Sequence, residues 1–199
     1  MIKPQLVLDI GGVLATNLSP LFWQLLAAEA IVSEEQLYSE YKQQISERLW
    51  TGQITEKQFW SWIAEYTPNL TSAQTRSFID RCLLPLPALA EIGNWNAVAD
   101  IHVLSNHLPA WVEPIITPIK PYLKSITISS EAALQKPHPA IFDKVNEQLP
   151  PDSFVLFVDD HPKNTKQAAL HGWHTLHADE DGRWISQVIP LLKQYSNKK

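Results

Sequence analysis

The stretch Leu6-Val7-Leu8-Asp9-Ile10-Gly11-Gly12-Val13-Leu14 decides how this sequence is interpreted. Its first three residues favour β-structure, and they lead into a carboxylate that is followed by a glycine-rich turn. This order predicts a buried strand with Asp9 at its exposed C-terminal end. Because a strand-end aspartate often forms an Asx-type turn, the stretch alone leaves open whether Asp9 is structural or reactive.

The composition indicates an ordinary soluble globular protein. Its 199 residues are enough for one sizeable core, and 45% of them are hydrophobic. The net charge of -5 gives no electrostatic reason to expect nucleic acid or an anionic membrane surface as a partner. A single cysteine, no signal-peptide pattern and no apolar run of transmembrane length favour a cytoplasmic location. The sequence leaves open whether the protein is a monomer or a homodimer.

Residues 17–85 are predicted to be helical throughout. Three capping-box patterns mark helix starts, at Ser33 to Gln36, Thr55 to Gln58 and Thr71 to Gln74. An apolar stripe with a spacing of four residues follows the first box and consists of Leu37, Tyr41, Ile45 and Leu49.

The remaining sequence alternates between short apolar strands and helices. Strands are predicted at Gln5–Asp9, Ile101–Ser105, Ser125–Ser129, Ser153–Asp159 and His174–His177. Helices are predicted near Ala88–Val98, Pro109–Ile119, Pro139–Gln148, Pro162–His171 and Arg183–Tyr195. This alternation predicts an α/β fold with a Rossmann-like parallel sheet between two layers of helices. Residues 1–16 and 86–199 would form this core, and residues 17–85 a small all-helical cap inserted after the first strand.

Polar side chains follow the ends of the predicted strands. Asp9 ends the first, Ser105 and Asn106 the second, and Asp159 and Asp160 the fourth, while Lys136 lies after the third. Ligands of parallel α/β sheets bind at this edge. Carboxylates suit a hard cation such as Mg²⁺, and a hydroxyl, a backbone amide and an ammonium suit a phosphoryl group. The pair Asp159-Asp160 could instead complement the dipole of the following helix, and Lys136 could be a solvated surface residue.

These motifs resemble the four motifs of the haloacid dehalogenase-like (HAD) superfamily in order and character. They are Asp9-Ile10-Gly11-Gly12-Val13, Ser105-Asn106, Lys136-Pro137, and Val158-Asp159-Asp160 with Asn164. The resemblance covers almost the whole chain and implies a Mg²⁺-dependent phosphatase with a helical cap. Asn164 is interpreted as a structural hydrogen-bonding residue.

The resemblance also implies a role for each motif residue. Asp9 would attack phosphorus and form an aspartyl-phosphate. Ser105 and the amide of Asn106 would hold the phosphate oxygens, and Lys136 would neutralise charge between Asp9 and the phosphate. The metal ligands would be Asp9, the backbone carbonyl of Gly11 and Asp160, with Asp159 ligating the ion or orienting its water.

Gly11 departs from the pattern of the superfamily, which usually carries a second aspartate there as general acid/base. Such a group contributes about 10²- to 10⁴-fold to the rate. Its loss predicts a slow enzyme, or one that prefers esters with good leaving groups. His107, His138 and His161 each follow a motif closely and are candidates for the missing proton transfer.

The leading hypothesis is therefore a hydrolase that releases phosphate from a small phosphorylated metabolite, such as a sugar phosphate. One alternative is a 2-haloacid dehalogenase, because those relatives also lack the second aspartate, although they typically lack the Asp-Asp pair. Another alternative is a non-catalytic protein that binds a phosphorylated ligand or a partner. Trp50, Trp60 and Trp62 would line the substrate entrance or, as the simpler interpretation, pack in the core.

Overall fold

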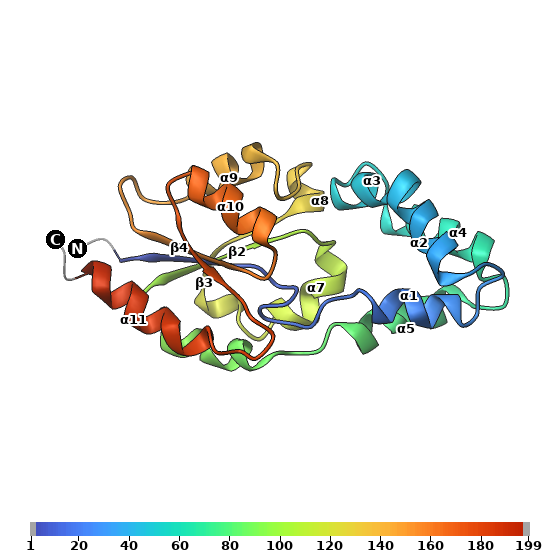
Figure 1. Ribbon diagram of the computed structural model, residues 1–199, viewed down its shortest axis with the longest axis horizontal. Helices are drawn as coiled ribbons and strands as arrows, with labels where there is room; N and C mark the ends of the chain where they lie inside the picture. The colour runs from blue at the N-terminus through green and yellow to red at the C-terminus, as the bar shows by residue number, and fades with distance from the viewer. Residues whose placement is uncertain (1–2, 197–199) are drawn as a thin grey trace.

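The protein, seen here in a computed structural model that describes residues 3–196, is built on a five-stranded parallel sheet (Figure 1). The strands are β1 (Gln5–Leu8), β2 (Asp100–Ser105), β3 (Leu123–Ile128), β4 (Val155–Asp159) and β5 (His174–His177). Their order in the sheet is β3-β2-β1-β4-β5, with β1 in the centre. The predicted α/β class is confirmed. The order reverses at β1, which makes the carboxyl end of this strand the expected place for a ligand.

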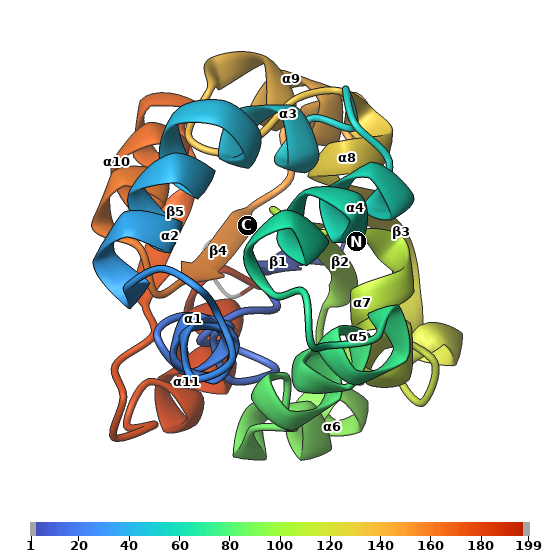
Figure 2. The same cartoon turned by 90° about the vertical axis from the view of Figure 1, so that its right-hand side faces the viewer.

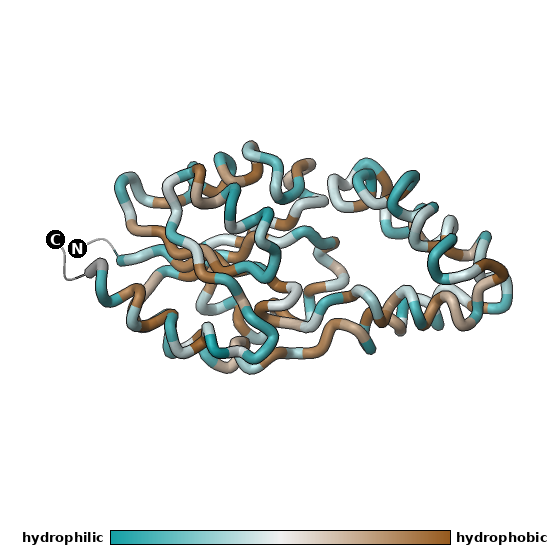
Figure 3. The backbone as a smooth tube through the Cα atoms, viewed as in Figure 1, coloured by the Kyte–Doolittle hydropathy of each residue, from teal (hydrophilic) through white to brown (hydrophobic). Residues whose placement is uncertain are grey.

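Helices cover both faces of the sheet. On one face lie α9 (Pro139–Asn146) and α10 (Pro162–Leu170), and on the other lie α6 (Ile92–Asn96), α7 (Pro109–Ile116) and α11 (Ile185–Ser196) (Figure 1). The side chains of β1 alternate between these layers. Leu6 and Leu8 join the cluster that includes α6, α7 and α11, and Val7 joins the cluster that includes α9 and α10. The central strands β1 and β4 are accordingly hydrophobic along most of their length (Figure 3).

Five further helices, here called the cap, lie beyond the carboxyl ends of the strands and lengthen the molecule (Figures 1 and 2). They are α1 (Leu21–Ala27), α2 (Glu34–Glu40), α3 (Ser46–Trp50), α4 (Glu56–Tyr66) and α5 (Ser72–Cys82). The chain enters the cap after β1 and returns before β2. The two linkers are tied by backbone hydrogen bonds from Thr16 N–H to the Leu84 carbonyl and from Leu86 N–H to the Leu14 carbonyl, both 2.9 Å.

The capping boxes set the starts of the cap helices. Those at Thr55 and Thr71 are complete, with reciprocal hydrogen bonds to Gln58 and Gln74, and Ser33 caps α2 through its side chain. Between α2 and α3 the helix contains a π-helical turn, η1 (Tyr41–Ile45). Side chains spaced four residues apart shift gradually around an α-helix, because one turn holds only about 3.6 residues. The π-helical turn holds more residues and offsets this shift. The whole predicted apolar stripe is buried as a result.

The helix predicted near residues 88–98 differs from the structure. It is a 3₁₀ turn, η2 (Pro87–Glu91), continued by the short helix α6. Gly93 and Asn94 are weak helix formers, which accounts for the short α-helical part. Short elements complete the core at η3 (Lys120–Tyr122) and α8 (Ser129–Ala132). Within the described residues, no helix is both long and apolar enough to cross a membrane.

Candidate active site

The carboxyl ends of β1 and β4 bring Asp9, Lys136 and Asp159 together. The Lys136 Nζ lies 2.8 Å from Asp9 Oδ2 and 2.5 Å from Asp159 Oδ2. Only 8% of Asp9, 4% of Lys136 and 0% of Asp159 is exposed. Lys136 is therefore a buried ammonium between two carboxylates and not a solvated surface residue.

The charges of this site do not balance without a cation. Asp9, Asp159 and Asp160 have carboxylate oxygens that all lie within 4.8 Å of one another. Three carboxylates against the one ammonium of Lys136 leave two negative charges, which a single divalent cation would neutralise. Oxygen-only donors of this kind suit Mg²⁺. The prediction of a site that fits Mg²⁺ is confirmed by this arrangement.

Burial and charge perturb two groups of the site. Burial raises the pKa of the Asp159 carboxyl, and the Asp9 carboxylate adds to the rise, while Lys136 opposes it. Burial alone would lower the pKa of Lys136, but the carboxylates of Asp159 and Asp9 outweigh it and raise that pKa. Lys136 therefore keeps its positive charge at neutral pH.

Asp160 lies on the exposed side of the acidic triad. The absence of a side chain at Gly12 leaves space for Asp160, and its absence at Gly11 leaves space for Asn17. A Cβ atom on Gly12, which has φ +68°, would lie 2.3 Å from Asp160 Oδ2. The same oxygen accepts a hydrogen bond of 2.8 Å from Asn17 Nδ2. A Cβ atom on Gly11 would lie 2.6 Å from Asn17 Oδ1. No sequence motif marks Asn17, because its contact joins a linker residue to a strand end 143 positions away.

Ser105 and Asn106 lie at the end of β2, next to β1. The Ser105 side chain is buried. Asn106 has a role that the motif did not reveal, because its carboxamide pairs with the backbone of Lys136. It donates to the Lys136 carbonyl at 2.9 Å and accepts from the Lys136 N–H at 2.8 Å. Asn106 thus fixes the loop that carries the lysine, while its own backbone amide is the group predicted to bind phosphate.

Asn164 has the structural role predicted for it. Its Nδ2 donates to both carboxylate oxygens of Asp159, at 2.9 and 3.0 Å, and the His161 N–H donates to one of them at 2.8 Å. These donors, together with Lys136, fix the orientation of Asp159.

The three candidate histidines differ in their surroundings. His138 is exposed and caps α9, because its Nδ1 accepts from the Ala140 N–H. The His161 side chain is also exposed. His107 is buried, its Nδ1 has no hydrogen-bond partner among the described residues, and burial lowers its pKa to about 4. Its ring centroid lies 5.6 Å from that of Trp50 in the cap. A histidine with this pKa is neutral at pH 7 and is a poor proton donor there.

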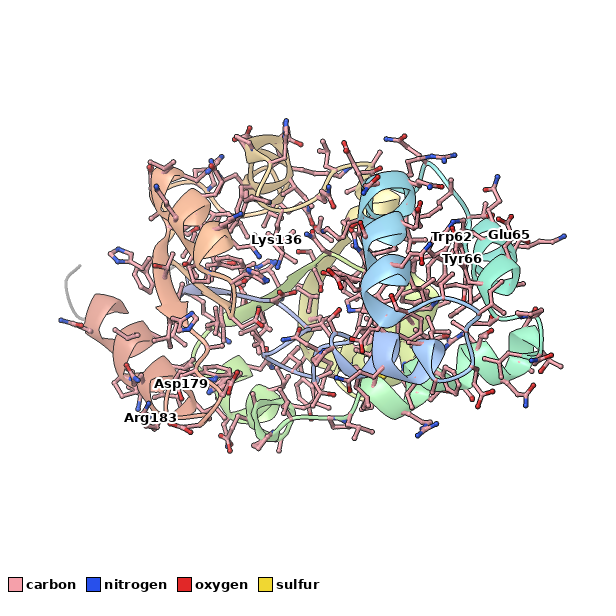
Figure 4. The ribbon with its side chains drawn as sticks, turned by 45° about the vertical axis from the view of Figure 1, so that its right-hand side comes forward. Trp62, Glu65, Tyr66, Lys136, Asp179 and Arg183 are labelled. Carbon is pink, nitrogen blue, oxygen red and sulfur yellow. The ribbon has the colours of Figure 1, made fainter. Side chains whose placement is uncertain are left out.

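The tryptophans of the cap pack in its interior and against the core. Trp62 is buried and packs at a tilted angle against Tyr66 on α4, away from Lys136 (Figure 4). Trp60 donates to Glu56, and Trp50 packs edge-on against Trp111 of α7. Core packing therefore describes these side chains, and Trp50 alone reaches a residue that follows a motif.

A polar cluster joins the cap to the core. Glu56 Oε1 accepts hydrogen bonds from Trp60 Nε1 at 2.9 Å and from Trp111 Nε1 at 2.8 Å, and lies 3.2 Å from Arg76 Nε. Arg76 also donates to the backbone carbonyl of Ala110 at the start of α7. We call Glu56, Trp60, Arg76 and Trp111 the Glu56 cluster. It fixes α4 and α5 relative to the helix that follows Ser105 and Asn106.

Comparison with solved structures identifies the architecture. The HAD family enzyme BT-2542 of Bacteroides thetaiotaomicron matches with a TM-score of 0.78 and 22% identity, over 92% of this chain and 97% of that one. A structure of that enzyme in complex with magnesium and inorganic phosphate matches with a TM-score of 0.75. A predicted HAD-like family hydrolase from Porphyromonas gingivalis matches with a TM-score of 0.76 and 20% identity, over 97% of this chain and 99% of that one.

An L-2-haloacid dehalogenase from Xanthobacter autotrophicus with chloropropionic acid covalently bound also matches. Its TM-score is 0.59 and its identity 21%, over 89% of this chain and 77% of that one. No protein-family profile matches the chain, and no curated protein matches it in sequence. The chain therefore has the fold of the HAD-like hydrolases, with a buried lysine and an aspartate triad at the carboxyl end of its sheet.

Proposed function

We propose that this protein is a Mg²⁺-dependent hydrolase that releases phosphate from a small phosphorylated metabolite. The observation that carries the proposal is the contact of Lys136 with Asp9 and Asp159 beside Asp160. An aspartate held against a buried ammonium and a divalent-cation site has the surroundings that a nucleophile for an anionic phosphoryl group needs. The magnesium and phosphate complex of the HAD family enzyme from Bacteroides thetaiotaomicron supports the same assignment.

Each residue of the site would have one role in the reaction. The Asp9 carboxylate attacks phosphorus, the bond from phosphorus to the leaving oxygen breaks, and an aspartyl-phosphate forms, while the leaving oxygen takes a proton from water. A water molecule then attacks phosphorus and loses its proton to the solvent, the bond from phosphorus to the Asp9 oxygen breaks, and inorganic phosphate leaves with the Asp9 carboxylate restored. Lys136 neutralises charge next to Asp9, and the Ser105 hydroxyl with the Asn106 amide holds phosphate oxygens.

Mg²⁺ would be held by Asp9, Asp160 and the backbone carbonyl of Gly11, with Asp159 ligating it or orienting its water. Bound there, the ion would offset the two excess negative charges of the site and stabilise charge on the phosphoryl oxygens. Asp159 is already engaged by Lys136 and Asn164, which favours the orienting role for it.

The dehalogenase alternative receives less support from the residues of the site. The structural match to the L-2-haloacid dehalogenase reflects a shared fold, with a TM-score of 0.59 against 0.78 for the HAD family enzyme. Halide leaves without a metal ion, so a dehalogenase has no use for the excess negative charge of Asp159 and Asp160. A non-catalytic binding protein, in turn, has no use for a carboxylate held 2.8 Å from a buried ammonium.

A phosphate-release assay tests the proposal. Purified protein is assayed with aryl phosphates and a panel of phosphorylated metabolites, with Mg²⁺ or with EDTA. We expect phosphate release that needs Mg²⁺ and is lost in Asp9→Asn. The same samples are assayed for halide release from 2-haloacids in EDTA. Halide release without phosphate release would support the dehalogenase alternative. If neither activity is detected, the non-catalytic binding protein becomes the favoured alternative.

A further inference from the structure

Gly11 lacks a side chain, but the space beside it is filled. The Oδ1 of Asn17 lies 2.6 Å from where a Cβ atom on Gly11 would be. The carboxamide therefore occupies the space into which a side chain at position 11 would extend. Its other end, Nδ2, donates to Asp160 Oδ2 at 2.8 Å. Asn17 thus joins the glycine of the first motif to the carboxylate of the fourth.

The backbone next to Asn17 is held firmly. The Thr16 N–H donates to the Leu84 carbonyl at 2.9 Å, and the Thr16 hydroxyl accepts from the Leu84 N–H at 2.9 Å and donates to the Cys82 carbonyl. Cys82 is the last residue of the cap helix α5, and Leu84 lies in the linker that returns from the cap. Asn17 therefore extends to Asp160 from the point where both linkers of the cap are joined.

Water reaches this contact. Asn17 is exposed, and with Gly12 it lines a cavity of about 280 Å³ between the first linker and the start of α11. An amide at such a place orients a carboxylate or a water molecule, but it neither takes up nor releases a proton at neutral pH.

From these contacts we propose that Asn17, which fills the space of the missing side chain at position 11, is a positioning residue that orients Asp160 for the divalent cation. The inference rests on the proposed function for the identity of that cation. Groups that orient metal ligands in this way typically contribute 10- to 100-fold to metal affinity.

A double-mutant cycle with magnesium binding as the readout tests the proposal. Calorimetry measures the Kd for Mg²⁺ of the wild type, Asn17→Ala, Gly11→Ala and the double variant. We expect about 10-fold weaker binding for Asn17→Ala. Gly11→Ala should bind similarly weakly, because its new Cβ atom displaces the carboxamide, and the double variant should be no weaker than either single variant.

Asn94→Ala is the matched control. Asn94 Nδ2 also donates to a carboxylate at 2.8 Å, that of Glu91, on the core helices away from the site. Its loss should leave the Kd for Mg²⁺ unchanged. Equal values for Asn17→Ala and Asn94→Ala would overturn the proposal, as would additive losses in the double variant or a wild type without measurable Mg²⁺ binding.

A charged variant gives a second readout. Asn17→Asp puts a carboxylate 2.8 Å from that of Asp160, where the two repel each other unless a cation lies nearby. We expect a lower Tm than wild type in EDTA and a larger rise in Tm on addition of Mg²⁺. Asn94→Asp, whose new carboxylate faces that of Glu91, should also lower the Tm in EDTA, but its rise on addition of Mg²⁺ should be no larger than that of the wild type. A rise for Asn17→Asp that is no larger than that of the wild type would contradict the proposal.

These measurements do not depend on turnover. If the predicted pattern of Mg²⁺ binding is found without phosphate release, the proposed function fails and the role of Asn17 stands. If phosphate is released but the pattern is absent, the role of Asn17 fails alone.

Discussion

Replacing Lys136 by methionine should destabilise the protein strongly. The Lys136 side chain is only 1% exposed, and its ammonium contacts two carboxylates, at 2.8 and 2.5 Å. Methionine has a similar length but no charge, so the carboxylates of Asp9 and Asp159 would face each other without a cation. Removing one partner of a buried ion pair costs about 3–5 kcal/mol. This is a large part of the stability of about 5–15 kcal/mol that is typical of a domain.

Urea unfolding, followed by tryptophan fluorescence in EDTA, measures this loss. We expect Lys136→Met to lower the free energy of unfolding by about 3–5 kcal/mol at pH 8. The loss should shrink at pH 5, because the pKa of Asp159 is already raised by burial and rises further without Lys136. A protonated Asp159 no longer repels Asp9, so acid removes part of the penalty.

Lys166→Met on α10 is the control, since Lys166 is exposed and its replacement should change stability little. A loss below about 1 kcal/mol for Lys136→Met, similar to that of the control, would show that the contacts of Lys136 with the two carboxylates do not stabilise the fold. A loss that grows as the pH falls would show that repulsion between Asp9 and Asp159 is not its cause.

Three further predictions concern the cap, the buried histidine and the glycine turn. Glu56→Ala leaves the buried Nε1 of Trp111 without its acceptor and should lower the free energy of unfolding, measured in urea, by about 1–3 kcal/mol. Glu65→Ala, on the exposed face of α4, is the control and should change this free energy little. Burial lowers the pKa of His107 from 6.5 to about 4, so the free energy of unfolding of the wild type should fall by up to about 3 kcal/mol as the pH drops through this window. The fall should be smaller for His107→Phe, which has no group that titrates there. Equal pH dependence of the two proteins in urea titrations would contradict this prediction. Gly12 has φ +68°, and Gly12→Ala would add a Cβ atom 2.3 Å from a carboxylate oxygen of Asp160. The Kd for Mg²⁺, measured by calorimetry, should therefore rise by about tenfold or more. An unchanged Kd would show that this turn tolerates a side chain.

The arrangement of the sheet and the main residues of the site follow from local sequence patterns. Runs of β-branched and aliphatic residues that end in Asp9, Ser105 and Asp159 predict strand ends, and parallel strands bring those ends to one edge. The capping residues Thr55 and Thr71 define helix starts by local hydrogen bonds, which sequence patterns capture well.

The remaining features depend on contacts between distant parts of the chain. Asn17 and Asp160 are 143 positions apart, and Asn106 and Lys136 are 30 positions apart. Both asparagines bond to distant segments, which no local sequence pattern indicates. The packing of Trp50 against His107 likewise depends on how the cap meets the core, which no periodicity within one helix determines.

Trapping with beryllofluoride shows whether Asp9 is a nucleophile toward phosphorus. Beryllofluoride mimics a phosphoryl group bound to a carboxylate, and fluorine NMR detects the bound form. We expect an adduct in the wild type that requires Mg²⁺ and is absent in Asp9→Asn. If the wild type forms no adduct with Mg²⁺, or if Asp9→Asn forms an equal one, Asp9 is not the nucleophile.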